Sequence, residues 1–483
     1  MADELKEKAS KSLVWSLLDK IGQVVITFIT GIITMRALTP HDYGLIGALA
    51  LFVAISHICI ESGFGLTLLR KESVSQKEYS AVFYFNIALG VTFYAILYFC
   101  APLIADYFHQ DELINLSRVL FLVLIINPMA LVQHVMLRRN LKFKELTLAS
   151  MGSVTGSLLI TLILLQFTQS YWVLAIQQLT LAGAKVIILW ILSPYKLTLK
   201  TSFSEIAPLF SFSLVLMLNS LITAFCNNIY SLLIGRHYSS IDLGHYSQSR
   251  KYSDIAPNTL HNCITSVSAP IFAKLNNELE RQKRYMVKFI RLTGFAIAPT
   301  AIYLWVCIPD LISFALTTKW LPIVPYFRIF VLCMLFECMH YQLSNFFIIK
   351  GLKKVVLGID TTKNIGLLLV AFICFTFFPK ELDTLIMGYG ILVCAIWIID
   401  LFWLKKTMDY NPLKVIRDLA PYYILALIAG YETYRISLLE LGLFLRIVIE
   451  GLGMFGTYLI LCKLTGSKVL DDILEMVKKK KQD

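Results

Sequence analysis

The sequence is poor in charged residues. Only 16% of its 483 residues are Asp, Glu, Lys or Arg, whereas soluble proteins carry about 25%. Hydrophobic residues make up 57% of the chain, and the mean hydropathy is +0.69. The charges are gathered into clusters separated by apolar runs of about 20 residues, the length of helix that crosses a bilayer. This pattern excludes an ordinary soluble protein and predicts an all-α polytopic membrane protein.

Several chemical signatures are also absent. The ten cysteines are scattered singly without a CxxC pair, no two of the eight histidines are four residues apart, and no Walker A pattern occurs. We therefore expect the cysteines to be packing residues, and we expect no metal site, no cofactor and no ATP hydrolysis by this chain. The polar start, MADELKEKASKS, does not resemble a cleaved signal peptide, so the first apolar segment is expected to stay as a span.

Fourteen apolar segments are long enough to span a membrane. Their number can be tested because cytoplasmic loops carry an excess of Lys and Arg. With the N-terminus in the cytoplasm, 30 of the 44 Lys and Arg residues fall in inside segments and only 4 fall in outside turns. The net charge of +12 is therefore a sign of topology, and no nucleic-acid partner is expected. The predicted spans cover 12–37, 43–69, 79–105, 113–136, 145–168, 171–193, 206–235, 240–268, 287–315, 322–349, 355–378, 383–404, 415–434 and 438–463.

An internal repeat divides the chain. The first outside turn, RALTPHDYG at 36–44, has an echo in RHYSSIDLG at 236–244, with Arg, Asp and Gly at matching positions. Each turn follows the first span of a half, so the halves enter the membrane in the same sense and form a parallel repeat. We predict an N-terminal lobe of six helices at 1–200, a C-terminal lobe of six at 201–408, and two additional helices at 409–465. A basic amphipathic tail at 466–483 is expected to rest on the anionic inner leaflet.

Four segments resemble the polysaccharide flippase family. They are RALTPHDYGLIGALALF at 36–52, ESGFGLTLLRKE at 61–72, LGHYSQSRK at 243–251 and APIFAKL at 269–275. The chain is similar to the Wzx-type branch of the multidrug/oligosaccharidyl-lipid/polysaccharide exporter superfamily over its whole length. The resemblance implies two six-helix lobes in a V shape with two extra helices. It also implies flipping of an undecaprenyl-pyrophosphate-linked oligosaccharide, an O-antigen or exopolysaccharide unit, from the cytoplasmic to the periplasmic leaflet.

Charged residues within the predicted spans define a candidate substrate site, because such charges are costly unless they face a cavity or a partner. Arg250 and Lys251 lie about ten residues into the eighth span, roughly 15 Å along a helix that rises 1.5 Å per residue. Asp254 lies one turn further on, which leaves one positive charge in excess. We predict a cationic cavity that holds the pyrophosphate, since Arg and Lys suit phosphate. The alternative is an ion pair that only joins helices.

Five more residues complete the predicted site. Lys20 in the first span and the amides Asn227 and Asn228 in the seventh are candidates for lining the cavity. The alternatives are that Lys20 snorkels to the headgroups and that the amides join helices. Glu337 lies in the middle of the tenth span with His340 one turn on, and these two residues are expected to take up a proton during transport unless they serve packing.

These observations favour a flippase without enzymatic activity. We expect it in a bacterial inner membrane with both termini in the cytoplasm. Its expected partners are the lipid-linked oligosaccharide and membrane lipids, with a polymerase and glycosyltransferases as further candidates. Two alternatives stay open. A cation-coupled multidrug exporter of the same fold needs an acidic cavity, and a membrane oligosaccharide polymerase or acyltransferase needs a large external loop with acids or histidines.

Overall fold

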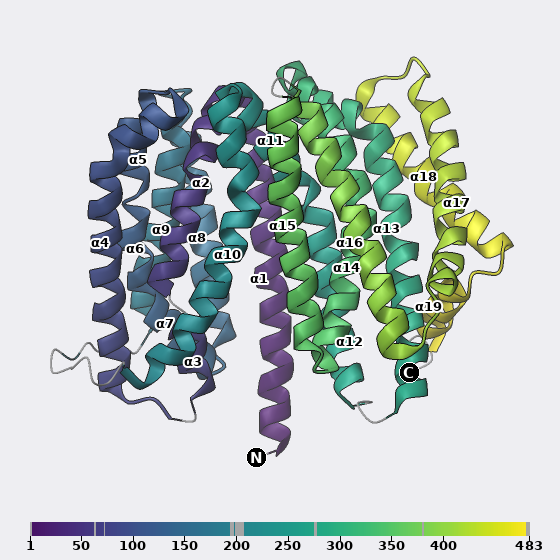
Figure 1. Cartoon of the computed structure of the whole chain (residues 1–483), viewed down its shortest axis with the longest axis horizontal. Coiled ribbons are helices and arrows are strands. Elements are labelled where there is room, and N and C mark those ends of the chain that lie inside the picture. The colour runs from purple at the N-terminus through teal and green to yellow at the C-terminus, as the bar shows by residue number, and fades with distance from the viewer. Residues whose placement is uncertain are drawn as a thin grey trace. The chain divides into compact units, whose positions relative to one another are not determined.

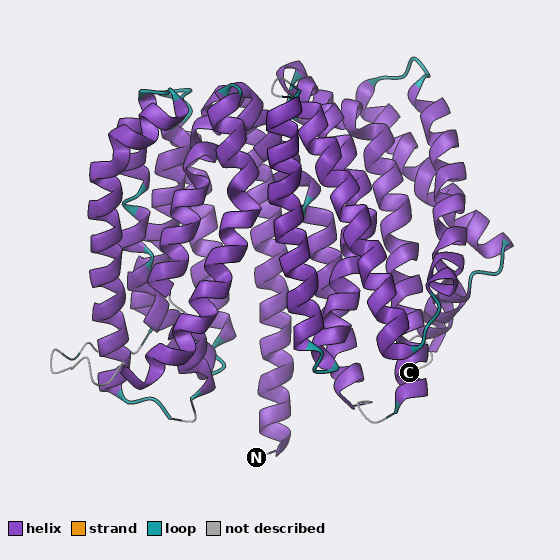
Figure 2. Ribbon diagram, viewed as in Figure 1, coloured by secondary structure: helices purple, strands orange, loops and turns teal. Residues whose placement is uncertain are grey.

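The computed structural model describes residues 2–61, 64–71, 73–193, 198, 207–274, 278–378 and 381–479. Every regular element in these ranges is a helix, and Figure 2 shows the helices joined mostly by short turns. The prediction of an all-α protein is therefore confirmed. The chain forms two compact units, Met1–Gly244 and His245–Asp483, which are named unit 1 and unit 2 below.

Unit 1 is built from long helices that stand upright in Figure 1, with α8 and α9 paired through a short turn. The Ser157 hydroxyl of α8 donates a hydrogen bond of 2.9 Å to the Gln177 carbonyl of α9. The elements are α1 (Ala2–Ala37), α2 (Pro40–Glu61), α3 (Phe64–Arg70), α4 (Gln76–Phe108), α5 (Glu112–Leu120), α6 (Val123–Ile126), α7 (Pro128–Arg139), α8 (Phe143–Leu164), α9 (Trp172–Leu192), α10 (Ala207–His237) and the first turn of α11 (Ser240–Ser253).

Unit 2 holds the rest of α11 and the remaining helices. Its α13, α17 and α18 pack through small and apolar side chains, among them Ala298, Ala426 and Met454. Small residues of this kind let membrane helices approach closely. The elements are α12 (Ile255–Lys274), α13 (Leu279–Ala315), η2 (Thr318–Ile323), α14 (Val324–Ile349), α15 (Lys353–Phe377), α16 (Leu382–Met408), α17 (Pro412–Ser437), α18 (Leu443–Leu464) and α19 (Lys468–Lys479).

Eleven stretches of the described chain are helical, long and apolar enough to cross a membrane. The other three predicted spans, 206–235, 240–268 and 415–434, coincide with α10, with α11 plus α12, and with α17. Large apolar side chains such as Phe99, Ile191 and Ile391 are more than 70% exposed, which suits lipid rather than water as their surroundings. The chain is therefore a multi-span membrane protein, and the count of fourteen spans stays a prediction.

Three predicted spans are interrupted. The fourth comprises α5, α6 and α7, and α7 begins at Pro128. The eighth comprises α11 and α12, which meet at Asp254. The second was predicted to run over 43–69, but α2 ends at Glu61 and the separate helix α3 begins at Phe64. Proline accounts for the break between α6 and α7 and for that between α11 and α12, since it lacks the N–H that an inner turn needs.

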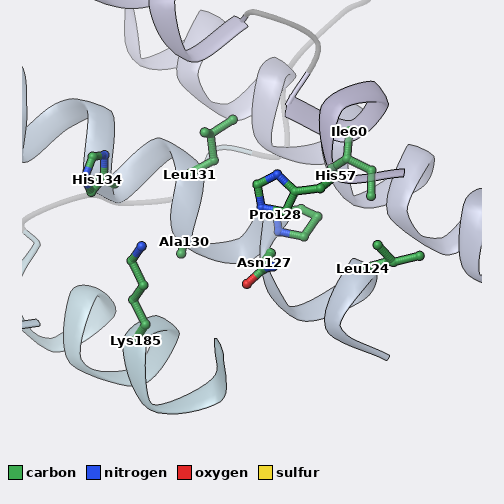
Figure 3. A pocket seen from close by; sticks show the side chains of 9 residues that line it. All are labelled: His57, Ile60, Leu124, Asn127, Pro128, Ala130, Leu131, His134 and Lys185. Carbon is green, nitrogen blue, oxygen red and sulfur yellow. The ribbon is translucent and has the colours of Figure 1, made fainter. Parts of the chain in front are cut away.

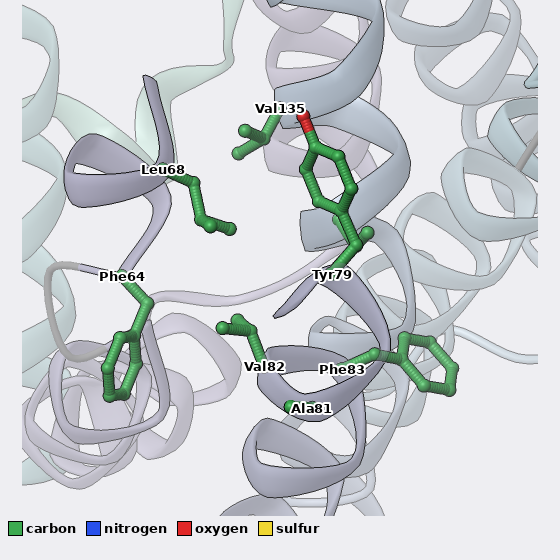
Figure 4. Close-up of a cluster of buried hydrophobic side chains, with 8 residues drawn as sticks. Phe64, Leu68, Tyr79, Ala81, Val82, Phe83 and Val135 are labelled. Carbon is green, nitrogen blue, oxygen red and sulfur yellow. The ribbon is translucent and has the colours of Figure 1, made fainter. Parts of the chain in front are cut away.

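The short helix α3 is fixed by a buried apolar cluster, drawn in Figure 4. Phe64 and Leu68 of α3 pack against Val82 of α4 and Val135 of α7. In addition, the Arg139 guanidinium donates a hydrogen bond of 2.8 Å to the Leu68 carbonyl, one of the last carbonyls of α3. Such carbonyls have no partner within their own helix, so this bond stabilises the end of α3.

The two repeated turns have the same hydrogen-bonded cap. In the first turn, the Thr39 backbone N–H and hydroxyl donate to Asp42 Oδ2 over 2.8 and 2.6 Å. In the second, the Ser239 backbone N–H and hydroxyl donate to Asp242 Oδ2 over 3.2 and 2.7 Å. An acid three residues after the Ser or Thr thus closes each turn and starts the following helix. The repeat predicted from the sequence is therefore also a repeat of local structure.

The repeated glycines mark a reciprocal close contact between the start of α2 and the start of α11. A Cβ added to Gly44 would lie 1.8 Å from the Ser240 carbonyl oxygen, and one added to Gly244 would lie 1.9 Å from the Pro40 carbonyl oxygen. The His41 ring nitrogen Nδ1 and the Ser240 hydroxyl are 2.6 Å apart in the same contact. Only glycine permits backbones to meet at this distance.

The unit boundary follows Gly244, whereas the predicted C-terminal lobe begins at 201. Residues 199–206, which include that predicted boundary, and residues 480–483 of the predicted tail lie outside the described ranges. Helix α10 belongs to unit 1 by compactness, because it packs against α2 and α3. The predicted lobes were divided by the sequence repeat, whereas the two units are divided by compactness. The boundary of the units therefore does not test the lobes, which stay a prediction. The two additional helices coincide with α17 and α18, and the tail begins with α19, whose Asp472 pairs with Lys288 of α13 at 3.0 Å.

Gly44→Ala is expected to lower the unfolding temperature of the purified protein in detergent, because the added Cβ collides with the backbone at Ser240. Overpacking of this kind costs about 1–3 kcal/mol. The matched control is Gly183→Ala in α9, since nothing lies within 4 Å of its added Cβ and alanine stabilises a helix interior by about 0.5–1 kcal/mol relative to glycine. Equal unfolding temperatures for the two variants would contradict the close contact.

Candidate functional site

The junction of α11 and α12 positions the charged residues predicted in the eighth span. Pro257 has no N–H to donate to the Ser253 carbonyl, and the helix is interrupted at Asp254. The chain still passes through the junction with hydrogen bonds from Asp254 N–H to the Arg250 carbonyl, 3.0 Å, and from Asn258 N–H to the Asp254 carbonyl, 3.1 Å. The result is a local interruption that places Arg250 and Asp254 at the end of α11.

Arg250 is the centre of a polar cluster in unit 2, named the Arg250 cluster, which also contains Asp254, Phe330, Glu337 and Tyr389. Its guanidinium donates to Glu337 Oε1 of α14 over 3.1 Å, and its Nε lies 3.1 Å from Asp254 Oδ2. It also lies over the rings of Phe330 and Tyr389, at 5.2 and 4.7 Å from their centroids. The Tyr389 hydroxyl donates to the same Glu337 oxygen. Arg250 is thus held by two carboxylates and two aromatic faces.

From the sequence, Arg250, Lys251 and Asp254 were counted as having one positive charge in excess, and the structure adds a fourth charged residue to this count. Glu337 joins Arg250 and Asp254, so the two carboxylates and the two cations Arg250 and Lys251 cancel. Lys251 is exposed and lies 5.6 Å from the centroid of the Tyr252 ring. Within the described residues Lys251 has no ion pair. Among these four residues Glu337 balances the expected excess of positive charge, while Lys363 of α15 adds positive charge near both carboxylates. Of the four, Lys251 is the cation left for a ligand, and the predicted cationic cavity stays a prediction.

Glu337 and His340 make separate contacts, although they were predicted to act together. Glu337 contacts the Arg250 cluster, whereas His340 Nδ1 lies 2.8 Å from Asp400 Oδ2 of α16. Asp400 is fully buried, and its other oxygen, Oδ1, has no hydrogen-bond partner among the described residues. His340 and Asp400 therefore form a buried imidazole–carboxylate pair with one acceptor unused.

The remaining predicted cavity residues belong to unit 1. Lys20 is exposed on α1, and Asn227 is exposed on α10. Asn228 is half-buried, and its amide donates a hydrogen bond of 2.9 Å to the Ala224 carbonyl of its own helix. The amide oxygen of Asn228 takes no part in that bond and can accept a hydrogen bond from a ligand. A cavity shared by these residues and those of unit 2 stays a prediction.

The apolar surface and the continuous helices define a polytopic helical membrane protein. Residues 33–325 match the model of a family described as polysaccharide biosynthesis protein. This match covers more than half of the chain, so the chain belongs to that family of polysaccharide biosynthesis proteins. The family resemblance seen in the four sequence segments is confirmed.

Individual relatives are distant. The chain is 24% identical over 324 residues to an uncharacterized membrane protein in the cps region of Klebsiella pneumoniae, covering 66% of this chain and 67% of that protein. It is 20% identical over 323 residues to the lipopolysaccharide biosynthesis protein WzxC of Escherichia coli, covering 66% of each. The matches thus span about two thirds of these relatives.

Solved structures share the fold. The lipid II flippase MurJ in an inward closed conformation matches 94% of this chain and 98% of its own, with a TM-score of 0.71 and 15% identity. An inward-facing multidrug resistance transporter of the MATE family matches 80% of this chain and 94% of its own, with a TM-score of 0.62 and 12% identity. Both likenesses concern the fold.

Two residues of this region escaped the sequence prediction. Asp400 is the single acid within the apolar run WIIDLFWL, and that isolation was the signal that could have found it. Tyr389 carries no such signal, because a tyrosine in an apolar helix is common. Its role follows only from its contact with Glu337.

Arg250→Met is expected to destabilise unit 2, because it leaves Glu337 buried without its cation. Removing one partner of a buried pair costs about 3–5 kcal/mol, and the lower end applies here since a quarter of the Arg250 side chain is exposed. Unfolding in detergent measures the effect. The double variant Arg250→Met/Glu337→Leu is expected to lose less than the sum of the two single losses.

Lys251→Met is the control for this prediction. Its side chain is exposed and unpaired within the described residues, so its effect should stay within about 0.5 kcal/mol. A loss in Lys251→Met as large as that in Arg250→Met would show that the ion pair is not what stabilises this region.

Proposed function

We propose that this protein flips a lipid-linked oligosaccharide from the cytoplasmic to the outer leaflet of a bacterial inner membrane. The observation that carries the proposal is the agreement of family and fold. The sequence belongs to a polysaccharide biosynthesis family, and the fold matches that of a lipid II flippase over 94% of the chain. Polysaccharide synthesis supplies the glycan, and a flippase fold supplies the means of moving it across a bilayer.

The architecture supports transport rather than catalysis. The described helices are joined mainly by short turns, and the described ranges contain no separate domain outside the helical units. A polymerase or acyltransferase needs an external platform for its acceptor. We therefore infer that the chain is not an enzyme. The bias of Lys and Arg supports cytoplasmic termini.

We assign the contacts to the pyrophosphate chiefly to exposed cations within the spans. Lys251 in unit 2 and Lys20 in unit 1 are exposed, as is the amide of Asn227. Arg250 is already held by Asp254 and Glu337. Its role is therefore to fix the end of α11, the part of the helix that carries Lys251. A phosphate group crossing hydrocarbon needs such partners, because a charge in the bilayer centre is costly. Asn228 adds an acceptor for sugar hydroxyls.

The test is complementation of a bacterial strain that lacks its own flippase and makes the matching lipid-linked glycan. Surface polysaccharide on intact cells is measured at matched protein level. The natural chain and Gly183→Ala are expected to restore it. Lys251→Met and Lys20→Met/Lys251→Met are expected to fold normally and to restore little of it, because the pyrophosphate has lost its cations.

Each outcome decides between candidate functions. Restoration by the natural chain and Gly183→Ala, but not by the lysine variants, supports a flippase that uses these lysines. Restoration by all variants supports a flippase but overturns the assignment of the lysines. Failure with the matching glycan, together with resistance to cationic drugs, would replace the proposal with a multidrug exporter of the same fold.

We assign proton coupling to the His340–Asp400 pair, because a buried imidazole and carboxylate at 2.8 Å can share and exchange a proton. In proteoliposomes, flipping by the natural chain is expected to respond to an imposed pH gradient. Asp400→Asn and His340→Gln should flip at the same rate with and without the gradient. Asp383→Asn, which changes an exposed acid of α16 in the same unit, should keep the response. A preserved response in Asp400→Asn would exclude the pair as the coupling site.

A further inference from the structure

Unit 1 contains a cavity of about 130 Å³ between α2, α7 and α9, shown in Figure 3. Four polar side chains line it, and the rest of the lining is apolar. They are His57 of α2, Asn127 at the junction of α6 and α7, His134 of α7 and Lys185 of α9. In Figure 3, Lys185 extends from its helix toward Ala130, and His57 lies next to Pro128 and Asn127. The cavity is distinct from the Arg250 cluster, which lies in unit 2.

Among the described side chains, the lining carries positive charge without a matching acid. No Asp or Glu is among those that line the cavity. Lys185 has no hydrogen bond and no ion pair within the described residues, and its electrostatic attraction to Asp19 of α1 is not a direct ion pair. Arg138 and Lys185 both act on His134 with positive charge. A lysine within a membrane span normally finds an anion, so the missing partner points to a negatively charged ligand.

The cavity lies near one end of its helices. His57, His134 and Lys185 are four, five and seven residues from the C-terminal ends of α2, α7 and α9, which is about 6–11 Å at the helical rise of 1.5 Å per residue. By the bias of Lys and Arg, these ends face the cytoplasm. Arg138 and Arg139 stand in the last turn of α7, where they would attract anions toward the cavity.

The cavity volume of about 130 Å³ is well above the roughly 10–15 Å³ that one water molecule requires. A phosphate group therefore fits in it. The ammonium of Lys185, the imidazoles and the Asn127 amide can all donate hydrogen bonds to phosphate oxygens.

We propose that this cavity, named the Lys185 pocket, binds a single phosphate-type oxyanion from the cytoplasmic side. The shared chemistry is a phosphate group, which either free phosphate or the headgroup of an acidic inner-leaflet lipid can supply. The proposal does not rest on the flippase function, because binding to the pocket requires no transport.

The experiment has two arms on the full-length protein in dodecyl maltoside, a detergent without phosphate. Equilibrium dialysis measures binding of radioactive inorganic phosphate, and native mass spectrometry measures binding of short-chain phosphatidylglycerol. One site per chain is expected in at least one arm. Lys185→Met should weaken it at least about tenfold, since a hydrogen bond to a charged group is lost. Lys185→Arg should retain it, and Lys363→Met, a lysine within a span of unit 2, should leave it unchanged.

The arms separate the two sources of phosphate. Binding in the dialysis arm assigns the pocket to free phosphate, and binding only in the lipid arm assigns it to a headgroup. The absence of saturable binding in both arms overturns the proposal, as does equal binding by Lys185→Met and the natural chain. If Lys185→Met fails to fold, His134→Asn takes its place with the same expected loss. Surface polysaccharide in the complementation test is a separate readout, so failure of the pocket and failure of the flippase function remain distinguishable.

Discussion

A charge placed among apolar helices must be matched by another charge or by hydrogen bonds, and this constraint organises the polar interior of the protein. The guanidinium of Arg250 is matched by Asp254 and Glu337 and covered by two aromatic rings. Asp400 is matched by His340. Lys185 has no carboxylate partner within the described part of unit 1, and a cavity faces it. The paired groups are structural or exchange protons, whereas a cation without an ion pair among the described residues, such as Lys185, Lys20 or Lys251, is a place for a ligand.

Two adjacent cations, Arg250 and Lys251, have different roles: the first is structural and the second is proposed to bind substrate. Arg250 and Lys251 are neighbours in sequence, yet Arg250 is held by Asp254 and by residues of α14 and α16, whereas Lys251 is exposed. Because successive helical residues are about 100° apart, a pair of basic residues seldom shares one environment. The guanidinium suits the held position, since its planar fork binds two carboxylates at once. The flexible ammonium suits the exposed position, where a passing substrate must be bound and released.

Sequence reasoning succeeded where the cause was local. The repeat of the turn at 36–44 in 236–244 was predicted, and the caps that form it, Thr39 with Asp42 and Ser239 with Asp242, involve residues within a single turn. The apolar runs likewise indicated spans directly. The short helix α3 was missed because its residues, such as Phe64 and Leu68, are as apolar as the span before it.

The candidate site was predictable only in part, because its contacts join distant residues. Arg250 and Glu337 were each recognised as costly charges, but they are 87 residues apart and nothing in the sequence pairs them. The same holds for His340 and Asp400, which are 60 residues apart. The spacing of residues on one helix determines which share a face, but not which other helix lies opposite. The Lys185 pocket depends on the meeting of three helices and was not predictable at all.

The pairing of Arg250 with Glu337 has a consequence for the order in which the chain enters the membrane. The α11–α12 segment is synthesised before α14, so its guanidinium has only Asp254 of the same segment as a carboxylate partner until Glu337 of α14 arrives. Neither α11 nor α12 is among the eleven described stretches that are both long and apolar enough to cross a membrane. The second carboxylate partner of Arg250 is therefore in place only after α11 through α14 have all been made.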